Sequence, residues 1–366
     1  MKITIERAAL LKTLVHVQSV VERRNTIPIL SNVLLSTEGG RLRMSATDLD
    51  IQIIDSAEAD IEREGTTTVP AQTLLDIVRK LPDGARVQLD VDGGRMKVVA
   101  GRSRFSIPCL PSEDFPNMPR GDMEHTITLT TSALQQGFER TRFAMSTEET
   151  RYYLNGIYLH VIDGVLLAAA TDGHRLARTR IETGDAPLVG MPSVIVPRKA
   201  VGEIVKLIGE YDGDIEIGVS RSKISFDIGN LSLTSKTVDG TFPDYARVIP
   251  VANNTAVTAD VKTLSAAVDR VTTIASEKTR AVRMKVENGV IVLSVTSPEN
   301  GTANDEVACE STGEIDIGFN ARYFTEVLKY VDSENVELRF DSGSSPVLIK
   351  DLSRPDDANV LMPMRV

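Results

Sequence analysis

The 366-residue sequence contains no tryptophan, two cysteines, four histidines and no long apolar run. No stretch approaches the ~18–20 apolar residues of a membrane-spanning helix, which excludes a helical membrane protein. The opening MKITIERAALL alternates apolar and charged residues instead of building an apolar signal core, so we expect no export. Cys109 and Cys309 are isolated, without a CxxC pair, and we expect two buried thiols in a reducing cytoplasm. With 42% hydrophobic and 25% charged residues, the chain is expected to be globular.

Signatures of catalysis are also scarce. There is no HExxH motif, and there is no GxxxxGK[ST] loop, so we expect no ATP binding or hydrolysis. Residues 220–223 match SxxK, but the companion SDN motif is missing and we interpret the match as a hairpin turn. ATDGHRLA places Asp172 and His174 two residues apart, where they would share one face of a strand. A hydrolase of unknown substrate that uses this pair is the alternative function, although no nucleophile or metal partner is identifiable; we expect no metal and no cofactor.

Three hairpin signals recur at a nearly constant interval, each between two runs with alternating apolar residues. Their turn residues are Gly39-Gly40, Asp163-Gly164 and Asn288-Gly289. The second glycines are 124 and 125 residues apart. A strand-to-helix step keeps the same period (VPAQTLLDIVRKL, VPRKAVGEIVKLI, FNARYFTEVLKYV), as does an earlier helix (AALLKTLVHVQSVV, SALQQGFERTRFA, VKTLSAAVDRVTTI). The period is too long for a solenoid. We infer three copies of one α+β domain, at residues 1–122, 123–250 and 251–366, each with antiparallel sheets and two helices.

The net charge of −10 argues against nucleic acid, but partners respond to the local field. The six expected helices together carry +8, which leaves −18 for the rest of the chain. These helices are expected at residues 7–24, 71–81, 131–143, 198–209, 259–271 and 321–331. In one interpretation, lysine and arginine merely solvate exposed helix faces. In the other, the helices present a positive surface to phosphates without sequence preference. The repeat favours the second, because three copies place their helices equivalently.

Eight segments carry a resemblance to a known family over essentially the whole chain. They are TIPILSNVLL, GRSRFSIPCLPSEDFPN, RYYLNGIYL, ATDGHRLA, VIVPRKAV, TSKTVDGTFPDY, IGFNARY and VLMPMRV. With these segments the chain resembles the bacterial DNA polymerase III beta subunit, the replicative sliding clamp. The resemblance implies the DNA clamp fold, in which three domains form half of a closed six-domain ring with helices lining the hole. It also implies a non-catalytic function: a head-to-tail homodimer encircles duplex DNA and tethers the polymerase, which confers processivity in the cytoplasm.

The resemblance further implies site residues. DNA contacts are expected at Arg24, Tyr152 and Tyr153, and by position at Arg79, Lys80, Arg198 and Lys199. An alternative interpretation makes Tyr152 and Tyr153 one buried and one exposed strand residue. A pocket for partner peptides is expected to use Leu154, Thr171, Gly173, His174, Arg175, Leu176, Pro243, Arg247, Val248, Asn320, Tyr323, Val360, Met362, Pro363, Met364 and Arg365. Phe105 and Ile274 are apolar candidates for the dimer contact between the first and third domains.

The implied partners are a second copy of the chain, duplex DNA, the DNA polymerase III catalytic subunit, the clamp loader, and other polymerases and repair proteins that carry short peptide motifs. No membrane is involved. Two methionines beside a proline offer a soft apolar surface that can repack around different peptides. Arg175, Arg247 and Arg365 are expected at its rim to hold polar or carboxylate groups. Thr279 and Pro346 depart from the family pattern, which puts this rim in doubt. The segment TEE at residues 147–149 places acid in a loop near the expected DNA path, which argues against that loop as a DNA contact.

Overall fold

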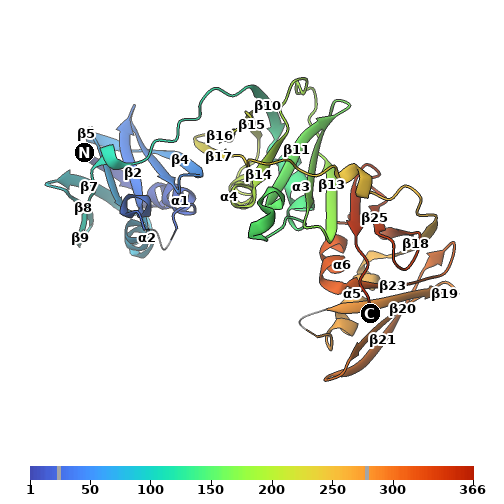
Figure 1. The fold of residues 1–366 in the computed structure, drawn as a ribbon. Coiled ribbons are helices and arrows are strands. Elements are labelled where there is room, and N and C mark those ends of the chain that lie inside the picture. The colour runs from blue at the N-terminus through green and yellow to red at the C-terminus, as the bar shows by residue number, and fades with distance from the viewer. Residues whose placement is uncertain (23–25, 277–279) are drawn as a thin grey trace. The chain divides into compact units, whose positions relative to one another are not determined.

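The computed structural model describes residues 1–22, 26–276 and 280–366. The chain packs as two compact units (Figure 1). The N-terminal unit comprises Met1–Gln135 and Thr183–Thr237, and the C-terminal unit comprises Gln136–Glu182 and Val238–Val366. Both units therefore contain part of the central repeat. Within the described ranges, no helix combines the length and the apolar character needed to cross a membrane.

Two antiparallel sheets build the N-terminal unit. The strands of the first are β1 (Lys2–Glu6), β5 (Asp60–Arg63), β7 (Arg86–Asp92), β8 (Arg95–Ala100) and β9 (Ser103–Pro108). Their order is β5-β1-β7-β8-β9. The strands of the second are β2 (Asn32–Glu38), β3 (Arg41–Thr47), β4 (Ile51–Glu58), β6 (Thr66–Pro70), β10 (His125–Thr130), β15 (Asp214–Val219), β16 (Lys223–Ile228) and β17 (Leu231–Lys236). Their order is β10-β15-β16-β17-β4-β3-β2-β6, so strands of the first and central repeats share one sheet.

The C-terminal unit repeats this arrangement. The strands of its larger sheet are β11 (Gly156–Ile162), β12 (Val165–Thr171), β13 (Arg175–Arg180), β18 (Thr255–Asp260), β22 (Glu310–Ser311), β24 (Asn335–Phe340), β25 (Val347–Asp351) and β26 (Ala358–Leu361). They follow the order β11-β12-β13-β26-β25-β24-β18-β22. The smaller sheet contains β19 (Ala281–Glu287), β20 (Val290–Ser297), β21 (Gly301–Ala308) and β23 (Ile315–Asn320). Its order is β21-β20-β19-β23.

Each of the six α-helices in the described ranges begins directly after a strand. They are α1 (Arg7–Gln18), α2 (Ala71–Lys80), α3 (Thr131–Arg142), α4 (Arg198–Ile208), α5 (Val261–Thr272) and α6 (Ala321–Leu328); α4 follows β14 (Val194–Pro197). Short 3-10 helices are η1 (Pro28–Ser31), η2 (Ser112–Asp114), η3 (Glu149–Leu154) and η4 (Tyr245–Val248). Helix α1 packs beside α2, and α5 packs beside α6 (Figure 1). The six helices together carry +7, so the expected basic excess on helices is present.

Apolar spacing explains how a first helix such as α5 attaches to its sheets. Its buried residues Leu264, Ala267, Val268 and Val271 follow the i, i+3, i+4, i+7 spacing of one helix face. They join the buried core of the third repeat, which includes the fully buried Phe319 and other phenylalanines of α6 and β24. Fully burying each large apolar side chain of this core contributes about 1.5–3 kcal/mol.

The three predicted hairpins are confirmed as β2–β3, β11–β12 and β19–β20. Both turn residues of each adopt positive φ, as the tight hairpin turn requires. Asp163 (φ 50°) and Asn288 (φ 51°) tolerate this conformation, and the glycines adopt it without steric cost. Both cysteines are free thiols, but they are half-buried, so the expectation of full burial was wrong.

Helix α1 is shorter than expected, ending at Gln18 instead of residue 24. The Ser19 hydroxyl donates to the carbonyl oxygen of His16 (2.7 Å), a local side-chain bond that competes with continuation of the helix. Arg24, a basic residue of the expected helix, lies outside the described residues, as does Thr279.

Candidate functional site

The ATDGHRLA segment forms the turn between β12 and β13, so Asp172 and His174 do not share a strand face as expected. Asp172 Oδ1 accepts hydrogen bonds from the backbone N–H groups of His174 (2.9 Å) and Arg175 (3.0 Å), and its Oδ2 accepts one from Arg175 Nε (3.1 Å). Gly173 adopts φ 86° at the centre of the turn. The carboxylate therefore holds the turn together. In the described part of the chain, no cluster of three or more His, Cys, Asp or Glu residues could bind a metal.

Arg175 is buried at the base of this turn, with only 8% of its surface exposed. Its guanidinium bonds Asp172, Glu326 and the carbonyl oxygen of Phe143. It also lies 4.2 Å from the ring centroid of Tyr323. Burial raises the pKa of Glu326, but hydrogen bonds from Arg175 and an arginine of α6 outweigh this and lower it overall. The sequence predicted Arg175 at the pocket rim, where it would bind polar or carboxylate groups of a peptide. In the structure its guanidinium is buried and already bonds groups of the protein itself.

The C-terminal segment lies against the same turn. Strand β26 pairs with β13. Beyond it, the Met362 N–H donates to the His174 carbonyl oxygen (2.9 Å), and the Met364 N–H donates to that of Gly318 in β23 (2.7 Å). A Cβ atom at Gly318 would overlap the Met364 carbonyl oxygen and come within 2.6 Å of Val366 Cγ1. The segment therefore approaches β23 closely because position 318 lacks a side chain.

Other expected pocket residues converge on the turn. The His174 ring stacks on Tyr323, with 6.3 Å between centroids. The Asn320 side-chain oxygen caps α6 by accepting from the N–H groups of Arg322 (3.0 Å) and Tyr323 (3.3 Å). The Thr171 hydroxyl donates to the Arg175 carbonyl oxygen (2.6 Å). These contacts bring the turn, the start of α6 and the C-terminal segment together.

The remaining pocket candidates differ in exposure. Leu154, Leu176 and Val360 are buried; Pro363 and Met364 are half-buried; Gly173, His174, Pro243, Arg247, Val248, Met362 and Arg365 are exposed. The η4 candidates are anchored beside β11, because Phe242 stacks on Tyr158 and the Tyr245 hydroxyl lies 2.7 Å from His160 Nε2. Burial lowers the pKa of His160 to about 4 and raises that of Tyr245 to about 12, so both are neutral near pH 7.

Tyr152 and Tyr153, the expected DNA contacts, lie on the 3-10 helix η3, which excludes the strand interpretation of this pair. Tyr152 is 54% exposed and meets Tyr153 edge-on, with 5.9 Å between ring centroids. The acidic loop before them is partly neutralised, since Arg151 bonds Glu148 (2.6 Å).

The expected DNA-contacting residues on the helices are exposed, but they differ in their hydrogen-bond and ion-pair partners. Arg79 and Lys80 end α2, and Arg198 and Lys199 begin α4. The Lys199 ammonium bonds Asp48, Glu22 and the Val20 carbonyl oxygen. Burial lowers the Lys199 pKa, but the carboxylates of Asp48 and Glu22 outweigh it and raise the pKa overall. Lys199 therefore faces competition from two acids for any phosphate.

The two dimer candidates lie in different units. Phe105 is on β9, the last strand of its sheet, and is 38% exposed. Ile274 follows α5 and packs, half-buried, against the core of the third repeat.

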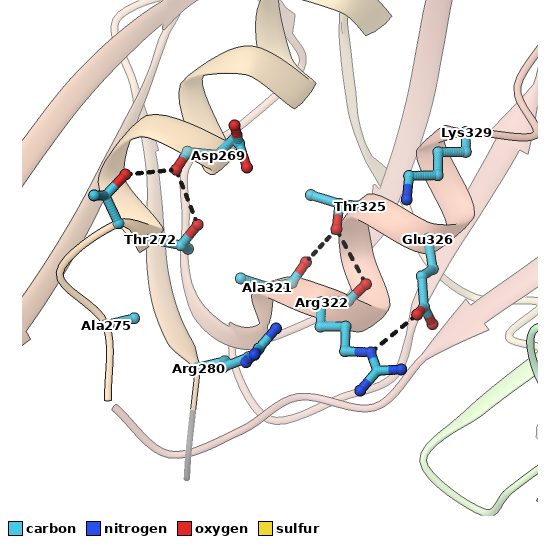
Figure 2. Close-up of a pocket in the computed structure, with 10 residues that line it drawn as sticks. Asp269, Thr272, Ala275, Arg280, Ala321, Arg322, Thr325, Glu326 and Lys329 are labelled. Atoms are coloured by element: carbon cyan, nitrogen blue, oxygen red, sulfur yellow. Dashed lines mark hydrogen bonds and ion pairs between the residues drawn. The ribbon is translucent and has the colours of Figure 1, made fainter. Parts of the chain in front are cut away.

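A polar cavity of about 510 Å³ lies between α5 and α6, and no motif in the sequence indicated it (Figure 2). It is lined by Asp269, Thr272, Thr273, Ala275, Arg280, Ala321, Arg322, Thr325, Glu326 and Lys329. Figure 2 shows Asp269 and Thr272 on one side, with Thr325, Glu326 and Lys329 on the other. Because Glu326 already bonds two arginines, the remaining charge in the cavity is positive. Superposing the three repeats would have revealed Lys329, because the ninth residue counted from the start of each second helix is basic.

Comparisons with known proteins cover the whole chain. The families that match are the N-terminal, central and C-terminal domains of the DNA polymerase III beta subunit, at residues 1–119, 128–244 and 246–365. A beta sliding clamp of Caulobacter vibrioides is 50% identical, and one of Escherichia coli is 37% identical, each over 100% of both chains.

Solved structures of beta sliding clamps are similar to this chain in both fold and sequence. A beta sliding clamp of Caulobacter crescentus has a TM-score of 0.97 at 50% identity, covering 100% of this chain and 99% of that one. A clamp of Bartonella birtlesii bound to griselimycin has a TM-score of 0.97 at 45% identity, covering 100% of both. The fold is thus confirmed as α+β with three clamp domains, and the hydrolase alternative at Asp172 and His174 was wrong. The chain belongs to the DNA polymerase III beta subunit family, the beta sliding clamps, which are non-catalytic subunits of the replicative polymerase.

Proposed function

We propose that two copies of this chain close head-to-tail into a six-domain ring that encircles duplex DNA in the cytoplasm. Residues 1–122, 123–250 and 251–366 are its domains. The ring slides without a tight DNA contact and keeps a bound polymerase near the primer end. Tethering raises the effective concentration of the polymerase, which provides processivity without any catalytic step. The observation that carries this proposal is the way in which consecutive domains share their sheets.

The sheets continue across both domain boundaries within the chain by antiparallel pairing. At the first boundary β17 pairs antiparallel with β4, with Leu233 opposite Ile53. At the second, β26 pairs antiparallel with β13, with Asn359 opposite Ala177. Ile53 and Ala177 are each the third residue of their strand, and their partners are the third residue of β17 and the second residue of β26.

A third boundary of the same kind would join two copies. Strand β9 corresponds to β17, and strand β21 corresponds to β4 and β13. Within the single chain, β9 and β21 each form one edge of their sheet. The register of the first boundary then sets Phe105, the third residue of β9, opposite Ala303, the third residue of β21 in the second copy. Leu233 is fully buried at its boundary, whereas Phe105 is 38% exposed in the single chain. A head-to-tail contact repeated by a two-fold axis closes the ring.

Mass in solution tests the ring, since a dimer requires twice 39.8 kDa. We expect the dimer to stay on circular DNA after loading and to leave linear DNA from its ends. Phe105→Glu places a charge at the centre of the contact and should produce monomers. Val189→Asp is the matched control, because Val189 is 95% exposed on the loop between β13 and β14. A monomeric wild-type chain at micromolar concentration would contradict the proposal.

For the DNA contacts we propose Arg24, Tyr152, Tyr153, Arg79, Lys80, Arg198 and Lys199. Support comes from the ninth residue counted from the start of the second helix of each repeat, which is Arg79, Lys206 or Lys329, all exposed. Lys329 directly follows the last residue of α6. Equivalent basic positions suit a duplex held through its phosphates, where charge matters and base identity does not. Lys329 also lines the polar cavity of Figure 2.

For the partners we propose that peptides from the polymerase catalytic subunit, the clamp loader and other DNA enzymes bind beside the β12–β13 turn. The surface, here called the peptide surface, comprises the exposed and half-buried residues of that turn, of the start of α6 and η4, and of the C-terminal segment. Its support is the convergence of the turn, the start of α6 and the C-terminal segment, since His174 stacks on Tyr323 and its carbonyl oxygen accepts from the Met362 N–H. The η4 residues are anchored beside β11. Met362 and Met364 can repack around different apolar side chains.

A further inference from the structure

A basic residue occupies the tenth position of the first helix in every repeat. The three residues are His16 in α1, Arg140 in α3 and Arg270 in α5. Because each helix begins directly after a strand, the three side chains project from the same face of their helices, at the same distance from the helix start. His16 and Arg140 are both 10% exposed, whereas Arg270 is 59% exposed. The residues that bury His16 and Arg140 indicate which second contact would bury Arg270.

His16 joins the first repeat to the central one. Its Nδ1 lies 2.7 Å from Asp55 Oδ2, and Asp55 is the fifth residue of β4 in the same repeat. Its Nε2 lies 3.3 Å from Glu210 Oε2, just beyond the end of α4 in the next repeat. Burial lowers the pKa of His16, but the hydrogen bonds to Asp55 and then Glu210 outweigh it and raise the pKa overall.

Arg140 makes the same kind of junction between the central and third repeats. Its guanidinium bonds Asp332 and the carbonyl oxygen of Tyr330 (2.6 Å), both just beyond the end of α6 in the next repeat. Asp351 and Asp357 lie 3.7 Å away. At both boundaries, therefore, the tenth residue of the first helix reaches the stretch that follows the second helix of the next domain.

Arg270 has one half of such a junction. Its Nε bonds Asp305 Oδ2 (2.6 Å), and Asp305 is the fifth residue of β21, as Asp55 is of β4. In the proposed ring, the other half would come from the next domain along the ring. In a closed ring the next domain is the first domain of a second copy, where Asp83 holds the position of Glu210. Each is the thirteenth residue counted from the start of its second helix.

Asp83 is suited to this contact. Its side chain is 95% exposed and bonds Arg7 Nη1 (2.5 Å), so its carboxylate is positioned but open to a second cation. We propose that Arg270 of one copy and Asp83 of the other form an ion-pair latch at each junction of the ring. The inference rests on the proposed ring. It places four charges, Arg7, Asp83, Arg270 and Asp305, in alternating sign across the junction, which favours this register over others.

The test is a charge exchange, read as the dissociation constant of the dimer by sedimentation. Arg270→Glu faces Asp83 with a like charge, and Asp83→Arg faces Arg270 in the same way. We expect each to weaken the dimer about tenfold. The double variant restores opposite charges and should regain most of that affinity. Arg270→Lys keeps the positive charge and should weaken the dimer less than Arg270→Glu. Arg283→Glu, which reverses an exposed arginine paired with Asp316, is the matched control and should not be rescued by Asp83→Arg.

The outcomes separate the latch from the ring. A wild-type monomer would overturn the ring and the latch together. A wild-type dimer that Arg270→Glu leaves unchanged, or that Asp83→Arg fails to rescue, would overturn the latch alone. Arg270→Glu removes the partner of Asp305 whether or not the latch exists. If Arg270 acted only through Asp305, Asp83→Arg would therefore not restore the affinity of the dimer. Unfolding temperatures of the variants establish that each one is folded.

Discussion

Replacing Gly318 by alanine should weaken peptide binding while leaving the fold intact. Gly318 accepts the hydrogen bond that holds Met364 on β23, and a new Cβ would overlap the Met364 carbonyl oxygen. The obstruction is backbone, so the C-terminal segment has to move. Met364 is half-buried and Arg365 and Val366 are exposed, so the segment can shift without disturbing the core.

The size of the effect follows from what the shift removes. The lost hydrogen bond between Met364 and Gly318 lies within the protein, so it is missing from the free and the peptide-bound variant alike and does not change the affinity directly. If Met364 withdraws about 40 Å² of apolar contact from the peptide, binding is weakened by about 1 kcal/mol. This corresponds to a roughly fivefold higher dissociation constant.

The assay is fluorescence anisotropy with a labelled peptide from the tail of the polymerase catalytic subunit. Gly202→Ala is the matched control, because its Cβ would meet nothing within 4 Å and should leave binding unchanged. Normal unfolding with unchanged affinity in Gly318→Ala would refute the reasoning, since the C-terminal segment would then not shape the peptide surface.

Three further perturbations should report on DNA contact and stability. Arg24→Ala should weaken association with every DNA sequence alike and reduce the salt slope by about 1, without changing the dimer; a base-specific loss would contradict it. Burial raises the pKa of Asp351, but hydrogen bonds from the Ser353 hydroxyl and nearby N–H groups outweigh it and lower the pKa from 3.8 to about 2. The resulting stabilisation of about 2 kcal/mol is present above pH 3.8 and lost as the pH falls through the folded pKa, so Asp351→Asn should lower the free energy of unfolding at neutral pH. The raised pKa of His16 gives the opposite dependence, with stabilisation present below 6.5 and lost as the pH rises through the folded pKa. In denaturant titrations at roughly pH 6 and 9, His16→Gln should lose this pH-dependent part; an unchanged difference would contradict it.

Features determined by local chemistry could be predicted from the sequence. The tight turns could be recognised from Asp163, Asn288 and the glycines that follow them, because few residues tolerate positive φ. The starts of the helices are also local, since each follows a strand end directly. The recurrence of these signals was enough to predict three copies of one domain.

Features determined by distant partners could not be predicted. Arg175 was expected at a rim, but Glu326 and the Phe143 carbonyl lie far from it in sequence and bury it. Asp172 was expected on a strand face, but it caps a turn with its own neighbours. The division into two compact units through the central repeat is likewise non-local, because it follows from strands of different repeats pairing in one sheet.

The saturation of Arg175 has a consequence for inhibitor chemistry. An acidic group on a compound directed at the peptide surface would gain little from this guanidinium, which already has two carboxylates, a carbonyl oxygen and an aromatic ring around it. Displacing any of them would cost as much as the new contact returns. Potency should instead come from lipophilic substituents placed against Met362 and Met364, and from an acid directed at the exposed Arg247.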